Sequence, residues 1–332
     1  MQLPPLPPTH YVLPELQLFI LPAAGGAAFV MCLFLVLGRW AGALGSAVAV
    51  VVAFAWANFT FTELKWEKTH YLIPWKPDDP DRAWLWLPRA ALVLVIVGLV
   101  SRWVGLIAGR LLTKPVVNYF GSDAIPEREG RYWWGANLLT WAPRAAAVLV
   151  VSGWLISERV ASEMPLLRWE LAGVMLLSWV ALDGVARGGA SGQVAAYQWA
   201  MFLAAGAILI YAHSLSFMEI ANVLAFAMLG VAVAAGSGRA DASGAVPAGV
   251  AFLPGLMLAA RQSLADNNVP ANSFWLIALA PVVLLPFLIP AVARQNKWLV
   301  IPLRTILVLA PLVVAVVLAG QHEQIVFPEE RY

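Results

Sequence analysis

Long apolar runs, separated by short polar stretches, recur along nearly the whole chain. A helix needs about 20 apolar residues to cross the hydrocarbon layer, and ten runs approach this length. They lie at 15–38, 41–59, 84–108, 133–156, 166–186, 193–213, 215–236, 246–260, 272–292 and 298–319. The runs do not alternate polar and apolar residues as the strands of a membrane barrel do. The sequence therefore predicts an all-α, polytopic integral membrane bundle of about ten transmembrane helices, within a range of roughly nine to eleven.

Proline and glycine interrupt three of these runs, where close helix packing is the favoured interpretation and broken helices are the alternative. The interruptions are Pro22 with Gly25 and Gly26 in the first run, Pro254 with Gly255 in the eighth, and Pro281, Pro286 and Pro290 in the ninth. The eighth run is also short, so a re-entrant segment is an alternative to a span. Broken helices expose backbone groups that can coordinate a substrate. Close helix packing is the more ordinary role of small residues and proline in membrane helices.

Composition agrees with a membrane protein and excludes several other classes. Of 332 residues, 61% are hydrophobic and 12% charged, against about 25% charged in soluble domains. The single cysteine, Cys32, allows no disulfide within the chain and no cysteine-based metal site. A net charge of +2 without a basic patch argues against nucleic acid as a partner. The expected partners are the lipid bilayer and other membrane proteins.

We expect one membrane domain over residues 1–332. Its parts are an exposed, proline-rich arm at 1–14, first-half helices within 15–112 and 133–186, second-half helices within 193–319, and an exposed tail at 320–332. The first Lys or Arg is Arg39, which follows the first apolar run, so no cleaved secretory signal is predicted.

The placement of basic residues predicts the orientation. With ten spans and an extracytoplasmic amino terminus, more than half of the 21 Lys and Arg residues fall on the inner side. These are Arg39, Arg102, Arg110, Lys114, Arg128, Arg131, Arg144, Arg187, Arg239, Arg294, Lys297 and Arg304. The positive-inside rule therefore favours a multi-pass protein of the cell (inner, cytoplasmic) membrane in this orientation.

A hexapeptide occurs twice, as THYVLP at 9–14 and THYLIP at 69–74. Further matches follow in the same order: LPAA at 21–24 with LPRA at 87–90, and Arg-Trp-x-Gly at 39–42 and 102–105. Tandem duplication of a two-helix unit explains this order. Convergence explains it as well, because many spans begin near proline and end with Arg and Trp at the inner face.

Candidate chemistry is sparse. Every ionisable residue is expected near an end of a span, and the absence of a central charge argues against proton or sodium coupling. His10, His70, His213 and His322 all fall on the outer side of the predicted topology. Low-specificity candidates for a metal site on that face are His70, Asp78, Asp79, Asp81, His213 and Glu219. The ordinary role of such residues is a polar side chain at the interface. No G-x-S-x-G elbow, phosphate-binding loop or dinucleotide motif is present, so neither a catalytic residue nor a cofactor is predicted.

Three functions remain open at this stage. The leading hypothesis is a permease-like transporter of a neutral or amphiphilic solute, which rests on the resemblance of the bundle to transporter architectures. It predicts a water-lined cavity that reaches mid-membrane between the helices that Gly and Pro interrupt, and a solid apolar centre would count heavily against it. The first alternative is a non-catalytic membrane subunit or assembly factor. The second alternative is a membrane enzyme that acts at the extracytoplasmic face through His70, His213 and the aspartate cluster.

Overall fold

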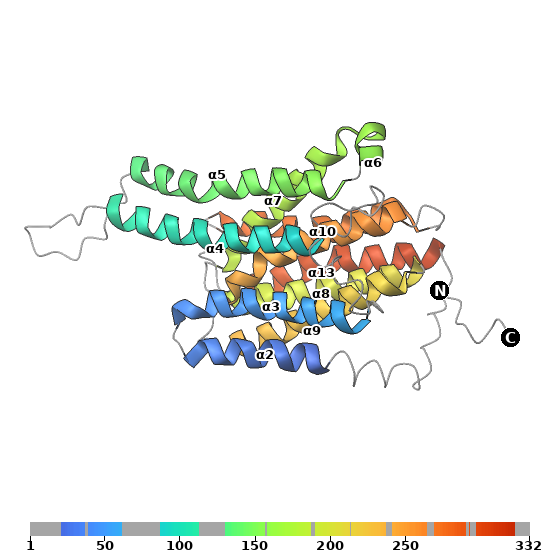
Figure 1. Cartoon of the computed structure of the whole chain (residues 1–332), viewed down its shortest axis with the longest axis horizontal. Helices are drawn as coiled ribbons and strands as arrows, with labels where there is room; N and C mark the ends of the chain where they lie inside the picture. Colours follow the sequence, from blue (N-terminus) through green and yellow to red (C-terminus); the bar gives the residue numbers. More distant parts are fainter. Residues whose placement is uncertain are drawn as a thin grey trace, which may run out of the picture.

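A computed structural model describes residues 21–36, 39–61, 87–112, 130–156, 158–186, 190–212, 214–236, 241–263, 269–289, 292 and 297–322. These residues are almost entirely helical and contain no strand, as the sequence predicts. The elements are α2 (Leu21–Val36), α3 (Arg39–Phe61), α4 (Leu87–Leu112), α5 (Gly130–Trp154), α6 (Glu158–Glu163), α7 (Leu167–Val185), α8 (Ser191–Tyr211), α9 (Leu215–Gly236), η5 (Ala242–Ala245), α10 (Val246–Ser263), α11 (Ala271–Leu279), η6 (Ala280–Leu288) and α13 (Lys297–His322). Most of the long helices run side by side in one bundle (Figure 1).

Each predicted apolar run contains one of these helical segments. Within the described residues, four stretches are long and apolar enough to cross a membrane: Ser191–Tyr211, Phe217–Gly236, Ala271–Leu288 and Trp298–His322. Four shorter apolar helical stretches accompany them, at Ala23–Phe34, Gly42–Ala53, Leu138–Trp154 and Ala242–Leu258. The helices are thus those of a membrane protein, while the predicted count of ten spans is not confirmed.

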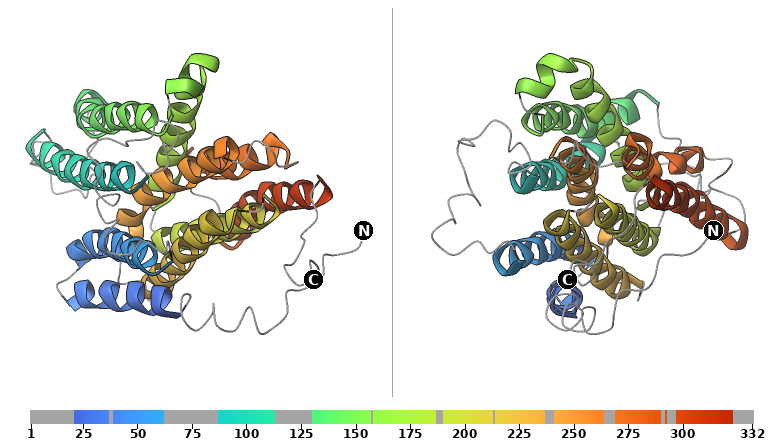
Figure 2. Two further views of the ribbon diagram at one scale, coloured as in Figure 1. Left: turned by 45° about the vertical axis from the view of Figure 1, so that its right-hand side comes forward. Right: turned by 90° about the vertical axis from the view of Figure 1, so that its right-hand side faces the viewer.

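Helix α10 lies in the middle of the bundle, with α2 and α5 farther out (Figures 1 and 2). It packs against α4, α7, α8 and α11. Every residue from 242 to 258 is buried, and a helix that is buried on all sides can be apolar on all sides. It is continuous through Pro254, so the helix is not broken there and the packing interpretation is the one that applies. Gly255 instead permits close packing, because a Cβ at this position would collide with Leu87.

The other two possible breaks have different outcomes. Helix α2 continues through Gly25 and Gly26, which are exposed and have no neighbour within 4 Å of a would-be Cβ, so that break is absent. The ninth run does change at Pro281, where α11 gives way to the 3₁₀ helix η6. Pro281 and Pro286 have no N–H to donate to the fourth residue before them, and a short stretch with two such gaps favours the tighter helix.

The structure does not confirm the predicted repeat. Both hexapeptides lie outside the described residues, and Leu21 and Leu87 each begin a helix, as a duplication requires. The third match differs, because Arg39 begins α3 whereas Arg102 lies in the interior of α4.

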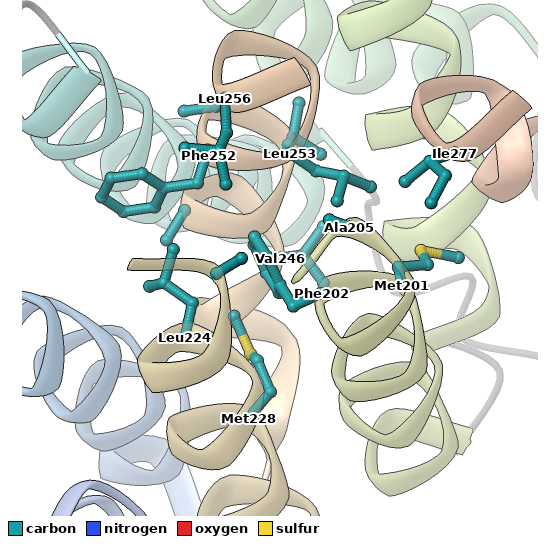
Figure 3. Close-up of a cluster of buried hydrophobic side chains, with 14 of the residues drawn as sticks. Met201, Phe202, Ala205, Leu224, Met228, Val246, Phe252, Leu253, Leu256 and Ile277 are labelled. Atoms are coloured by element: carbon teal, nitrogen blue, oxygen red, sulfur yellow. The ribbon is translucent and has the colours of Figure 1, made fainter. Parts of the chain in front are cut away.

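An apolar centre fills the space between α8, α9, α10 and α11 (Figure 3). Met201 and Phe202 of α8, Leu224 of α9 and Phe252 of α10 all contribute to it, and each of these side chains is at most 1% exposed (Figure 3). A cavity was predicted between the helices that Gly and Pro interrupt. A cavity does lie there, beside Pro254 and Pro281, but it has only about 10 Å³ of room for the centre of a water molecule. That is space for about one water.

Large apolar side chains also cover the outer surface of the bundle. On α13, Val313 is 60% exposed and Val317 40% exposed, while Ala315 and Ala319 face inward and are fully buried. A soluble domain rarely exposes so continuous an apolar face. The pattern fits a helix with lipid on one side and the bundle on the other.

Candidate functional site

A buried ion pair joins α5 to α7. A guanidinium nitrogen of Arg144 (Nη1) lies 2.6 Å from a carboxylate oxygen of Asp183, and the two side chains are 2% and 4% exposed. Arg144 belongs to the interior of α5. The expectation that every ionisable residue lies near an end of a span was therefore wrong for this arginine. The energetic reason is the pairing, because a charge within the bundle is tolerated when an opposite charge and hydrogen bonds accompany it.

The rest of the Arg144 side chain is also enclosed by partners. Its Nε donates a hydrogen bond to the Ser101 hydroxyl at 2.8 Å, and Nη2 donates to the Gly98 carbonyl at 3.3 Å. The guanidinium lies over two indole rings, 4.8 Å from the centroid of Trp141 and 5.0 Å from that of Trp179. Cation–π contacts of this kind are strongest where water is excluded. Helices α4, α5 and α7 thus all contribute to holding one positive charge.

A second ion pair lies beside the first and joins α4 to the segment that leads into α10. Arg102 Nη2 is 2.5 Å from an Asp241 carboxylate oxygen, and both side chains are 29% exposed. Nη1 of Arg102 donates to the Ser243 hydroxyl. The other Asp241 oxygen accepts the Ser243 backbone N–H at 2.9 Å, so this carboxylate also caps η5. One aspartate therefore fixes both the arginine and the turn that starts the central helix.

Small residues allow these segments to approach. A Cβ on Gly98 would lie 2.7 Å from Pro247 Cγ and 3.0 Å from a Trp179 ring carbon. A Cβ on Gly244 would collide with the backbone carbonyl of Ala43 on α3. The approaches of Gly98 to Pro247 and of Gly244 to Ala43 are closer than real Cβ atoms tolerate. Glycine at these two positions therefore lets α4, α10 and α3 come close enough for the ion pairs to form.

We call the two pairs, Arg144–Asp183 and Arg102–Asp241, the charged cluster; all of these residues except Asp241 line one small hollow. Arg102, Arg144, Asp183 and Ser243 line it together with Trp179, and it has about 10 Å³ of room for the centre of a water molecule. Two arginines and two aspartates make the cluster formally neutral. Each charge has a partner: one pair connects α5 to α7, and the other connects α4 to the segment before α10.

Five of the six metal-site candidates predicted from sequence lie outside the described residues, so the site stays a prediction. His70, Asp78, Asp79, Asp81 and His213 lie outside the described part of the chain, as does His10. Glu219 lies near the start of α9 and is partly buried, and His322 is exposed at the end of α13. In the ranges that the structure describes, no three His, Cys, Asp or Glu residues are grouped so that they could hold a metal ion.

Sequence reasoning did not identify the charged cluster, although one signal was present. Arg144 stands in the middle of the apolar run 133–156, where a charge is costly unless it is paired. The sequence places Arg102, Asp183 and Asp241 at span boundaries or in loops, where charged residues are common. Only the packing of distant helices shows that these four side chains meet.

No protein-family model matches the chain, and comparisons with curated proteins and with solved structures find no similar protein. The site must therefore be interpreted from its own geometry.

Proposed function

We propose that the chain is a permease-like membrane protein that moves a small neutral or amphiphilic solute, and that the charged cluster latches one end of the bundle shut. We place it in the cell membrane with ten spans and an extracytoplasmic amino terminus. The observation that carries the proposal is the buried Arg144–Asp183 pair. An ionisable pair inside a membrane bundle is costly, and function is the usual reason for its presence.

The connections of the two pairs indicate how such a latch would work. Arg144–Asp183 ties α5 to α7, and Arg102–Asp241 ties α4 to the turn before α10. Helices α4 and α5 pack together and lie at one side of the bundle (Figure 2). When both pairs open, these two helices can move as a unit away from α7 and α10. Rocking of one helical unit against another is the usual basis of alternating access.

Cysteine accessibility tests the proposal without knowledge of the solute. Cys32, the only cysteine, is replaced by serine, and Met201→Cys places a thiol in the apolar centre, where Met201 is fully buried. Transport requires that this centre open to water, so a membrane-impermeant thiosulfonate reagent labels the thiol in membrane vesicles. Arg102→Gln loosens one latch and raises the labelling rate.

Val313→Cys on the outer face of α13 is the matched control, because lipid keeps the reagent away from it. Labelling at the centre that exceeds labelling at this control supports a permease. A thiol at position 201 that stays unlabelled with and without Arg102→Gln contradicts it.

The closed apolar centre favours a second candidate, a non-catalytic membrane subunit or assembly factor. The tightly packed side chains in Figure 3 leave no solute-sized space among them. In this case the ion pairs fix the register of the helices permanently. Purification with a stoichiometric membrane partner supports this candidate, and a stable solitary monomer in detergent argues against it.

A further inference from the structure

A second small cavity lies between α7, α8 and α10, next to the charged cluster along α7. Trp179 and Asp183 of α7 line the hollow at the cluster, whereas the preceding residues Ser178 and Leu182 line this cavity. Gln198 of α8 and the α10 residues Gly249 and Val250 complete its polar side. Its room for the centre of a water molecule is about 10 Å³. That volume is close to the least that one buried water needs.

Two polar atoms at this cavity have no partner. The Ser178 hydroxyl and the Gln198 amide oxygen are both buried, in side chains that are 1% and 2% exposed, and neither makes a hydrogen bond within the protein. The amide nitrogen of Gln198 donates to the Val246 carbonyl at 3.4 Å. A buried polar atom without a partner is costly, and it points to a bound molecule where there is room for one.

A break in the backbone hydrogen bonding adds a third polar group. Pro254 has no N–H, so it cannot donate the helical hydrogen bond to the carbonyl of Val250, which lines the cavity. The residues that line the cavity thus include two buried side-chain atoms without a partner and one backbone carbonyl, that of Val250, that receives no helical hydrogen bond from position 254. A buried water typically makes two to four hydrogen bonds, roughly the number available here.

Gly249 makes this arrangement possible. A Cβ at position 249 would lie 2.8 Å from Gln198 Cδ and closer still to the amide nitrogen. Only glycine at this position lets the Gln198 amide lie this close to α10.

We propose that this cavity is a binding site for one water molecule. The bound water accepts a hydrogen bond from the Ser178 hydroxyl and donates to the Gln198 amide oxygen and the Val250 carbonyl. The occupant is neutral, because no ionisable side chain lines the cavity and an unpaired charge in such surroundings is strongly disfavoured. Transport is not required for this inference, which stands whether the protein is a permease or a subunit.

A comparison of two serine variants tests the inference in the full chain. Ser273 is also fully buried and its hydroxyl also lacks a partner, but it does not line this cavity. Ser273→Ala removes an unsatisfied hydroxyl and leaves the thermal midpoint unchanged or raises it. Ser178→Ala removes a hydroxyl that the water satisfies, so we expect the midpoint to fall by about 1–2 °C.

A structure of the purified protein at a resolution that shows waters gives the direct measurement. We expect one water-sized density within about 3.2 Å of both the Ser178 hydroxyl and the Gln198 amide oxygen. An empty cavity overturns the proposal, and so does a Ser178→Ala midpoint that rises as much as that of Ser273→Ala.

Discussion

The Arg144 guanidinium and the Asp183 carboxylate lie 2.6 Å apart, although 39 residues separate them along the chain. Their helices, α5 and α7, pack against each other, and the indole of Trp179 covers the same guanidinium. Removing one partner leaves the other charge buried and alone, which costs far more than the intact pair contributes. This asymmetry gives the first prediction.

Asp183→Ala lowers the free energy of unfolding by about 3–5 kcal/mol, the usual loss when one member of a buried pair is deleted. Denaturation of the purified protein in detergent measures the change. The double variant Arg144→Met with Asp183→Leu removes both charges and retains apolar volume, so it is expected to be closer to the wild type than the single variant. A single variant as stable as the wild type would contradict the buried pair.

The second pair is half-exposed, and its removal has a smaller effect. Asp241→Asn removes the charge opposite Arg102 but keeps a side chain that can cap η5, so unfolding changes by at most about 1 kcal/mol. Asp241→Ala also removes the cap that accepts the Ser243 N–H and costs about 1 kcal/mol more. The difference between these two variants isolates the cap. Equal effects would show that the cap contributes nothing.

Packing of η5 on α3 depends on Gly244. The methyl group of Gly244→Ala meets the Ala43 carbonyl, which is backbone and cannot rotate away. We expect a loss of at least about 1–3 kcal/mol, together with weaker Arg102–Asp241 pairing. Gly173→Ala is the matched control, because nothing lies within 4 Å of a Cβ there. If the Gly244→Ala protein is as stable as the Gly173→Ala control, the close approach of η5 to α3 is ruled out.

The outer face of α13 is predicted to contact lipid. A spin label on Val313→Cys, in a chain without Cys32, collides more often with oxygen than with a water-soluble nickel chelate, because oxygen concentrates in hydrocarbon. Met164→Cys supplies the contrast: Met164 is 48% exposed and lies between α6 and α7, at a predicted outer loop. At Met164→Cys we expect the nickel chelate to relax the spin label more strongly than oxygen does. Equal behaviour at the two sites would contradict a membrane boundary between them.

Fusions to the chain ends test the topology. Ten spans with an extracytoplasmic amino terminus place both ends outside the cytoplasm. Alkaline phosphatase is active only outside the cytoplasm, so we expect it to be active when fused to either end. Green fluorescent protein that is exported through the general secretion route does not fluoresce, so we expect no fluorescence from either fusion. A fluorescent amino-terminal fusion would show that the amino terminus is cytoplasmic, which is the reverse of the proposed orientation. If the two chain ends lie on opposite sides of the membrane, the number of spans is odd.

The positions of the helices follow from sequence because apolar length is a local property. The runs at 193–213 and 215–236 correspond closely to α8 and α9. Which helix is central is not local: the run at 246–260 is short and contains Pro254, yet α10 is the most enclosed helix of the part described. Its burial comes from neighbours that lie far away in the chain.

Helix breaks and the charged cluster show the same limit. Pro254 and Pro281 both interrupt apolar runs in the sequence. Helix α10 is nevertheless continuous through Pro254, whereas Pro281, together with Pro286, lies in the 3₁₀ helix η6. Arg144 and Asp183 belong to different runs, and only the crossing of α5 and α7 pairs them. Identifying the cluster required knowledge of which helices touch.

The location of α10 in the middle of the bundle has a consequence for biosynthesis. Helices α2 and α3 pack on α9, and α4 packs on α10, so the first half of the chain leaves the ribosome before its permanent neighbours exist. Arg102 is separated from Asp241 by 139 residues. At a synthesis rate of about 5–20 residues per second, Asp241 is added roughly 7–28 s after Arg102. Throughout that interval the charge of Arg102 must be sheltered by water, lipid headgroups or an insertase.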